Sequence, residues 1–380
     1  ELGRAKPARA HATTKKRTLG GSFRSPAGEL GRAKPARAHA ISEPALAGRH
    51  GVLQLRAAVL RAVRGYFEEQ GFLEVETPAR VRSPGQEVHL DAIPAGSDER
   101  GPRYLITSPE YHMKRLVASG LPRIVQLCRC FRAEEMGPLH QPEFTMVEWY
   151  RAGSTLDDLM RDCESVVEAA ARAVDGWPCV AVPAGRRNPQ GGASINLCAP
   201  FERTTVRAIL AEHAGISLRG DESAGEMRAL AARAGSTVAA DAAWDDCFYQ
   251  VFLDRIEPHL GCARPVFVAD WPLPLAALAR RKPGDDLTAL RFELYAGGLE
   301  LANAFAELTD PVEQRQRFTE ESAIRAARSK TVYPIDEQLL DALAHLPPTC
   351  GIALGFDRLM MLVTGAASIR DVMAFAADEV

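Results

Sequence analysis

Two apolar, strand-like runs joined by Gly297-Gly298 are the feature that most constrains how this chain can fold. A pair of glycines between two such runs is a strong signal for a tight β-hairpin turn, because both turn positions need a positive φ angle. With a two-residue turn there, Tyr295 faces Glu300, and Glu293 lies diagonal to Glu300 on the same face. The pattern predicts an antiparallel hairpin. Its two glutamates fit either a cation site or an ordinary solvent-facing surface.

Further strand-like runs occur along the chain, mostly in neighbouring pairs. They cover residues 73–77, 104–107, 124–131, 144–150, 266–269 and 351–355. Apolar residues at three- and four-residue spacing predict an amphipathic helix from Val52 to Tyr66 that stops at Gly71. Residues 155–260 are rich in alanine and mostly helical in pattern. Strands paired in this way are typical of an antiparallel sheet, so we predict an α+β fold with the sheet flanked by helices.

The composition is that of an ordinary globular protein, with 46% hydrophobic residues. No run approaches the roughly 18 uncharged apolar residues that a membrane span needs, so we expect no membrane partner. The eight cysteines are scattered, and none forms a C-x-x-C pair. This spacing favours reduced thiols in a cytoplasmic protein over a disulfide framework or a zinc site.

The first 50 residues differ in composition from the rest of the chain. The segment ELGRAKPARAHA occurs at 1–12 and again at 29–40, and residues 1–50 hold 11 basic and 3 acidic side chains. Because this segment has few large apolar residues, it cannot bury enough surface to offset its ordering entropy. We therefore predict a disordered basic tail at 1–50 and one folded domain at 51–380. The folded domain carries a formal charge of −11, which does not suggest a general nucleic-acid binder.

A second group of polar residues lies on the paired strands near residues 124–151. Side chains alternate across a strand, so Phe144, Met146, Glu148 and Tyr150 share one face. Glu148 and Tyr150 together would make an anionic, hydrogen-bonding wall. Arg132 follows the first strand of the pair; taken alone, an arginine at a strand end is usually a solvated charge.

A third group lies in GIALGFDRLMM at 351–361, where a strand meets a helix. Gly355 permits close approach of the backbone to a flat ligand. Arg358, near the start of the helix, could bind a phosphate, for which a guanidinium is better suited than an ammonium. Asp357 fits a structural pair with an arginine equally well.

The order and spacing of these groups resemble the three signature motifs of class II aminoacyl-tRNA synthetases. The segment with GFLEVETPAR is similar to motif 1, FRAEE…HQPEFTMVEWY to motif 2, and GIALGFDRLMM to motif 3. TSPEYHMKRL at 107–116 and ELANAFAELTD at 300–310 narrow the resemblance to the lysyl branch. Within it, the chain resembles the stand-alone paralogues that modify elongation factor P. The resemblance covers residues 50–380 and implies a class II synthetase fold that uses ATP and Mg²⁺.

The resemblance also implies roles for individual residues. The implied ATP-binding residues are Arg132, Ala133, Glu134, Gln141, Phe144, Glu300, Leu301, Gly355 and Arg358. Three of these, Arg132, Glu300 and Arg358, are implied to be catalytic, and Phe144 to stack on adenine. Two hard carboxylates beside a nucleotide suit Mg²⁺, so Glu293 and Glu300 are the expected metal ligands.

The amino-acid substrate implied is lysine or (R)-β-lysine. The wall for the amine next to the carboxylate is expected at Ser108, Pro109 and Glu110. The pocket for the distal ammonium is expected at Glu148, Tyr150, Asn303 and Glu307. Carboxylates suit this role because a buried cation must be paired.

Five positions depart from the usual lysyl pattern. Ala133 and Gln141 each replace an asparagine, Ala304 replaces a glycine beside the substrate, and Ala306 replaces a histidine. Ala353 replaces the glycine that is typical of lysyl-tRNA synthetases, while the elongation factor P paralogues resemble this chain in having alanine. We therefore expect a preference for (R)-β-lysine over α-lysine.

The acceptor is expected to be a lysine amine of elongation factor P. The first 50 residues have no strand pattern, so they cannot supply the five-stranded anticodon-binding barrel of a bacterial lysyl-tRNA synthetase, and tRNA is an unlikely partner. Two alternatives remain open: a truncated enzyme that charges tRNA, and a non-catalytic regulatory paralogue. The motif 1 resemblance implies a homodimer.

Overall fold

The computed structural model describes residues 46–133, 135–183, 185–186 and 192–380 of the chain. Its centre is a nine-stranded, mostly antiparallel sheet in the order β1-β5-β6-β14-β13-β12-β10-β9, with β11 paired to β12. The strands are β1 (Leu73–Glu74), β5 (Arg123–Phe131), β6 (Glu143–Ala152), β9 (Glu202–Thr205), β10 (Val266–Pro272), β11 (Arg281–Lys282), β12 (Asp285–Ala296), β13 (Leu299–Ala306) and β14 (Thr349–Gly355). The predicted α+β fold with an antiparallel sheet is confirmed.

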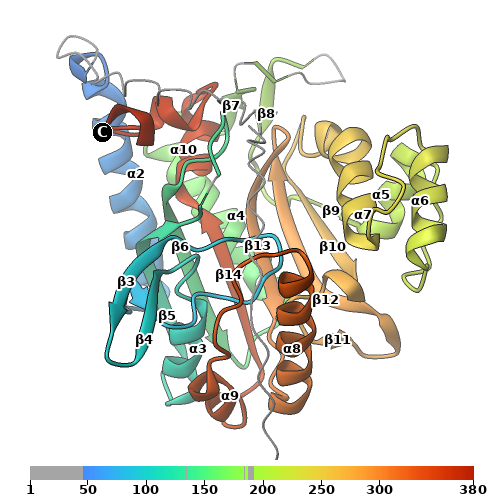
Figure 1. Ribbon diagram of the computed structural model, residues 1–380. Helices are drawn as coiled ribbons and strands as arrows, with labels where there is room; N and C mark the ends of the chain where they lie inside the picture. Colours follow the sequence, from blue (N-terminus) through green and yellow to red (C-terminus); the bar gives the residue numbers. More distant parts are fainter. Residues whose placement is uncertain (1–45, 134, 184, 187–191) are drawn as a thin grey trace, which may run out of the picture. The chain divides into compact units, whose positions relative to one another are not determined.

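Helices cover the sheet on both faces (Figure 1). The helices are α2 (His50–Glu69), α3 (Glu110–Ala118), α4 (Leu156–Arg172), α5 (Val206–Ala214), α6 (Ala224–Arg233), α7 (Trp244–Val251), α8 (Pro311–Ala327), α9 (Glu337–Leu343) and α10 (Phe356–Thr364). The main core joins α2, α4 and α10 to the sheet, and a second core joins α3 and α9 to the opposite face. Helices α5 to α7 pack beside β9 and β10 around a third core.

Two small sheets complete the domain. One consists of β2 (Arg80–Val81), β4 (Gly101–Leu105) and β3 (Pro94–Asp98), and the other of β7 (Cys179–Ala181) and β8 (Ser194–Asn196). The short strands β7, β8 and β9 interrupt the region that the sequence pattern predicts to be mostly helical. The predicted strand at 73–77 is also shorter, since only Leu73 and Glu74 pair with β5.

The Gly297-Gly298 hairpin has the predicted turn, with φ angles of 61° and 67°. Tyr295 faces Glu300 as expected, but the register shifts one residue further along, so that Glu293 faces Asn303. The cause is a β-bulge, because β13 has one more residue than β12 between these two pairs. The bulge therefore places Glu293 directly opposite a polar residue of the predicted substrate pocket.

The folded domain begins a few residues before position 51. Arg49 donates hydrogen bonds to the Ala374 carbonyl and to Glu379, each at 2.8 Å, and so joins the start of α2 to the C-terminal residues. The predicted disordered tail lies, for residues 1–45, outside the described residues. Among the described helices, none combines the length and apolarity that crossing a bilayer requires.

Candidate active site

A cavity of about 550 Å³ opens beside β6, β13 and β14 and is bordered by α3, α7, α8 and α10. Most of the predicted site residues line it: Ser108, Glu110, Arg132, Gln141, Phe144, Glu300, Leu301, Asn303, Ala353, Gly355 and Arg358. The others do not line it: Pro109, Ala133, Glu148, Tyr150, Glu293 and Glu307. Glu134 lies outside the described residues.

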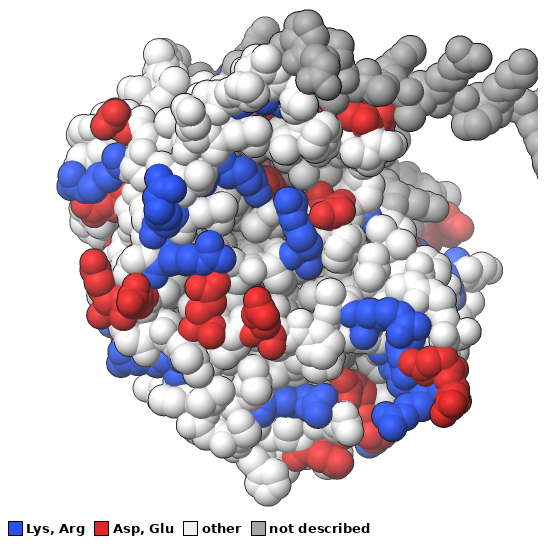
Figure 2. Space-filling view, turned by 90° about the vertical axis from the view of Figure 1, so that its left-hand side faces the viewer, with Lys and Arg blue, Asp and Glu red and all other residues white. Residues whose placement is uncertain are grey.

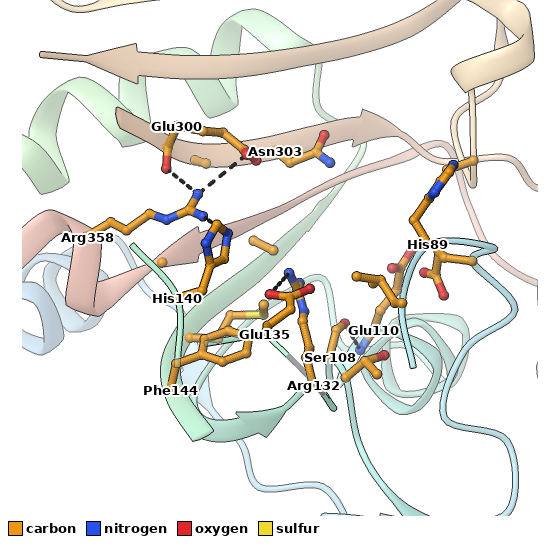
Figure 3. Close-up of a pocket in the computed structure, with 18 of the residues that line it drawn as sticks. His89, Ser108, Glu110, Arg132, Glu135, His140, Phe144, Glu300, Asn303 and Arg358 are labelled. Carbon is orange, nitrogen blue, oxygen red and sulfur yellow. Dashed lines mark hydrogen bonds and ion pairs between the residues drawn. The ribbon is translucent and has the colours of Figure 1, made fainter. Parts of the chain in front are cut away.

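The cavity has two chemically different ends (Figure 3). Arg358, His140 and Phe144 lie at one end, while Ser108 and Glu110 lie at the other, with Arg132 between the two groups. One end is therefore basic and aromatic, as a nucleotide requires, and the other is acidic, as an amine requires.

Arg132 faces the cavity, and one of its hydrogen-bond donors has no partner among the described residues. Its guanidinium lies 5.0 Å from the centre of the Phe144 ring and 3.8 Å from Glu135. Its Nε is buried and has no hydrogen-bond partner among the described residues. Because a buried donor without a partner is costly, this atom is poised for an anionic ligand.

Arg358 is held in place by Glu300 and His140. Its Nη1 donates to the Glu300 carbonyl at 2.9 Å and lies 3.4 Å from the Glu300 carboxylate, and its Nη2 lies 2.7 Å from His140 Nε2. Burial and the charge of Arg358 lower the pKa of His140, so a neutral imidazole can accept this hydrogen bond. Arg358 also stands in the first turn of α10, where the helix dipole favours anions.

Asp357 has a structural role, which the sequence left open. Its carboxylate accepts a hydrogen bond from the Thr145 backbone at 2.7 Å and pairs with Arg56 at 2.5 Å. It therefore ties α10 to β6 and α2, and in this way fixes the helix that carries Arg358.

Glu293 and Glu300 occupy different environments. Glu300 lines the cavity, whereas Glu293 is buried and accepts hydrogen bonds from Arg291 and from the Tyr295 hydroxyl. Burial raises the pKa of Glu293 to about 7, and the charge of Glu300 contributes to the rise. Each carboxylate oxygen still has a second lone pair, so the two residues fit a shared cation, with Glu300 the more accessible ligand.

The predicted pocket for the distal ammonium lies behind Ser108 and Glu110. Glu148 accepts hydrogen bonds from Ser108 at 3.0 Å and from the Tyr150 hydroxyl at 2.7 Å. Glu307 lies deeper still and is 1% exposed. The residues predicted to bind the distal ammonium therefore do lie close together. Of these residues, Asn303 lines the cavity, whereas Glu148, Tyr150 and Glu307 lie behind its wall.

Lys114 is the residue of this cluster that sequence analysis missed. Its ammonium lies 2.6 Å from both Glu110 and Glu307. Of these two contacts, only the one with Glu110 could have been predicted from the sequence, because Glu110 and Lys114 are four residues apart on the same helix.

The cluster has more carboxylates than it has ammonium partners for them. Lys114 binds Glu110 and Glu307, while Glu148 lies close enough to Glu110 for the charge of Glu110 to raise its pKa. Burial raises the pKa of Glu148 well above its usual range and that of Glu307 to about 8. The Oε1 atom of Glu307 is buried and has no partner among the described residues. A substrate ammonium would restore the balance of charge.

Gly351 leaves the space that this cluster needs. A Cβ atom at this position would lie 2.2 Å from the Tyr150 ring and 2.4 Å from Glu307 Oε1. Any larger residue would push the phenol and the carboxylate away from their present positions.

Residues 47–379 match the family model of class II tRNA synthetases for D, K and N. The chain belongs to this family. It is also 40% identical over 332 residues to proteins named "Elongation factor P--(R)-beta-lysine ligase" from Salmonella paratyphi B (strain ATCC BAA-1250 / SPB7), Salmonella schwarzengrund (strain CVM19633) and Salmonella heidelberg (strain SL476). These alignments cover 85% of this chain and 94% of each relative.

In this class II synthetase domain, two further residues support the site without having been predicted. Arg291 donates a hydrogen bond to Asn303 at 3.1 Å and also binds Glu293, so it links the two opposed strands of the hairpin. His140 positions Arg358. Sequence patterns reveal neither Arg291 nor His140. The register of β12 with β13 brings Arg291 close to Asn303, and the fold of the loop before β6 brings His140 close to Arg358.

Proposed function

We propose that this chain is an ATP-dependent ligase that activates (R)-β-lysine or lysine as an aminoacyl adenylate and transfers the acyl group to a lysine side chain of elongation factor P. The 40% identity to proteins named for this reaction supports the proposal. The observation that carries it is the buried cluster of Glu110, Glu148, Glu307 and Lys114, in which Glu307 Oε1 has no partner among the described residues. Such a cluster suits the distal ammonium of a lysine-like substrate.

In the first step, a carboxylate oxygen of the substrate forms a bond to the α-phosphorus of ATP, the bond from that phosphorus to the bridging oxygen of the β-phosphate breaks, and pyrophosphate leaves. A carboxylate is already ionised at neutral pH, so this step needs no general base, and positioning and charge neutralisation carry the catalysis. Arg132, between the two ends of the cavity, suits the contact with both the carboxylate and the α-phosphate. Arg358 suits the outer phosphates, and the Phe144 ring suits the adenine.

Mg²⁺, when bound, would neutralise phosphate charge, and Glu300 together with Glu293 would hold it. We also propose a homodimer. Leu55 on α2 and Leu73 on β1 are 37% and 52% exposed, and β1 is an edge strand that a second copy could cover. Lys and Arg are interspersed with Asp and Glu on the face shown in Figure 2, so this face is not the clustered basic surface that tRNA binding requires.

ATP–pyrophosphate exchange tests the activation step. We expect exchange with (R)-β-lysine and more weakly with α-lysine, and labelling of elongation factor P by the wild-type protein. A double variant, Glu293→Gln with Glu300→Gln, should lose Mg²⁺-dependent exchange while keeping its fold. Absence of exchange with either isomer in the wild type would refute the proposed function, and near-normal exchange in the double variant would refute the metal ligands.

A further inference from the structure

A second acidic wall lines the cavity beyond Glu110. Glu87, in the segment between β2 and β3, and Glu321, on α8, both line the cavity. The two segments are in direct contact. Arg325, one turn after Glu321, donates to the backbone carbonyl of Glu87 at 2.8 Å, and Ser322 donates to the side chain of Gln86 at 3.1 Å.

The nearby cations form their ion pairs with other groups. Lys114 binds Glu110 and Glu307, and Arg132 lies 3.8 Å from Glu135. Arg325 binds Asp91, and Arg317 binds Glu313 and two backbone carbonyls. In the described part of the chain, neither Glu87 nor Glu321 has an ion pair or a hydrogen bond to another side chain. The Oε2 atom of Glu87 is buried and has no partner there at all.

An unpartnered hydroxyl also points into this wall. Tyr111 on α3 is only 5% exposed, and its hydroxyl has no hydrogen-bond partner among the described residues. After burial, the charges that most raise its pKa are those of Glu87, Glu321 and Glu110. A buried hydroxyl beside two unneutralised carboxylates is the environment that a cationic donor would complete.

The wall continues to the surface. His89 and Ile324 line the same cavity, and they are well exposed, with 47% of the His89 side chain and 43% of Ile324 accessible. Glu87 and Glu321 each lie two or three residues along the chain from these rim residues. A long, flexible side chain that enters the cavity past this rim would find both carboxylates on the cavity wall.

We infer that Glu87 and Glu321 form a subsite for the attacking amine of the acceptor, a primary amine on a protein side chain, and that Glu87 removes its proton. The inference rests on the proposed function. The substrate's own amines are already matched by Glu110 and by the cluster of Glu148 and Glu307, so this second wall is left for another amine. An acceptor amine needs such help because it is protonated at neutral pH and has no lone pair with which to attack.

The acceptor ammonium gives one proton to the Glu87 carboxylate. Its freed lone pair forms an N–C bond with the carbonyl carbon of the aminoacyl adenylate, and the C–O bond to the phosphate of AMP breaks, so that AMP leaves with the bonding electrons. The second N–H proton passes to solvent as the amide forms. The positive charge of the approaching ammonium favours the ionised form of Glu321, which then holds the ammonium in place.

The electrostatics of the wall suit proton removal. Burial, together with the charge of Glu110, raises the pKa of Glu87, and burial with the charge of Glu87 raises that of Glu321 to about 8. A base with a raised pKa accepts a proton more readily from an ammonium. The charged and titratable groups that act on these two carboxylates come from α3, from the end of β5 and from α8: Glu110, Tyr111, Lys114, Arg132, Arg317 and Arg325.

The test measures adenylate formation and acyl transfer separately in the variants Glu87→Gln and Glu321→Gln. Pyrophosphate exchange should stay within a few-fold of wild type in both variants. Single-turnover transfer from the preformed adenylate to elongation factor P should fall roughly 100- to 10,000-fold in Glu87→Gln, the usual effect of losing a general base, and should recover partly at high pH. In Glu321→Gln the acceptor KM should rise. Glu320→Gln, on the exposed side of α8, is the matched control and should behave as wild type.

Hydroxylamine provides a second acceptor, because it is already unprotonated at neutral pH. Glu87→Gln should form the hydroxamate at the wild-type rate while failing with elongation factor P. Equal loss with both acceptors, or unchanged transfer to elongation factor P, would overturn the assignment of Glu87. A wild-type protein that exchanges pyrophosphate but acylates no lysine amine would overturn the acceptor subsite, whereas one that exchanges none would overturn the proposed function itself.

Discussion

Ala353 lies on β14 between two polar residues of the predicted amino-acid pocket. It is paired with Asn303 on β13 and with Glu148 on β6, and it lines the cavity. Its methyl group therefore occupies space on the pocket floor between two residues that are expected to bind the distal ammonium. A change there would shift the position of the whole substrate, which is the reason for the proposed preference between lysine isomers.

Replacing Ala353 with glycine should shift the preference from (R)-β-lysine toward α-lysine. One methyl group in a pocket is worth about 1–3 kcal/mol, so the ratio of kcat/KM for the two isomers should change by roughly 10- to 200-fold. The measurement is kcat/KM for each isomer in pyrophosphate exchange. An unchanged ratio would remove Ala353 from the determinants of specificity.

Asp357 connects three elements of secondary structure. It lies at the start of α10, accepts a hydrogen bond from the backbone of β6 and forms an ion pair with Arg56 on α2. Asp357→Asn keeps the volume but leaves Arg56 without its carboxylate. Breaking one partner of a buried ion pair should lower the free energy of unfolding by about 3–5 kcal/mol, measured by urea denaturation. The exposed pair of Arg64 with Glu74 is the control, and Arg64→Ala should cost less than about 1 kcal/mol. Equal effects of the two substitutions would contradict the role of Asp357 as a clamp.

At the start of the chain, residues 1–45 can be tested separately from the residues around Arg49, which contact the C-terminal part of the domain. Deletion of residues 1–45 should leave pyrophosphate exchange and Tm unchanged, because the composition of this segment predicts no packed core. Adding Arg49→Ala to the truncated protein should then lower its stability by about 1.5–3 kcal/mol, since the hydrogen bonds to Glu379 and the Ala374 carbonyl are lost. A large loss of activity on deletion alone would show that the tail belongs to the active domain.

The unpaired carboxylates should also shape how the stability of the molecule depends on pH. The pKa of Glu321 is about 8 in the folded protein, against an ordinary value of 4.5, so the folded state favours the neutral form. Its stabilising contribution is fully present below about pH 4.5 and is lost as the pH rises through about 8. Relative to Glu321→Gln, the wild type should therefore lose stability across this range in chemical denaturation. Parallel profiles would show that Glu321 ionises as freely in the folded state as in the unfolded chain.

Much of the domain could be predicted from local patterns. The Gly297-Gly298 turn, the amphipathic helix α2 and the strands β5, β6, β12, β13 and β14 are each specified by residues close together in the sequence, so periodicity and turn chemistry reveal them. The motifs that identify the class II synthetase family are local in the same sense. The short strands β7, β8 and β9 were not visible, because segments of three or four residues are stabilised by tertiary pairing and hardly by their own pattern.

Local sequence patterns were enough to predict the fold class, the family and the side chains that are candidates for the site. How those side chains are paired could be seen only in the folded domain. Lys114 lies between Glu110 and Glu307, a bulge sets Glu293 opposite Asn303, and α8 brings Glu321 beside Glu87. The charge of each group, and hence its chemistry, depends on neighbours that are distant in the chain. Burial and pairing act through space, whereas a sequence pattern records only what is near along the backbone.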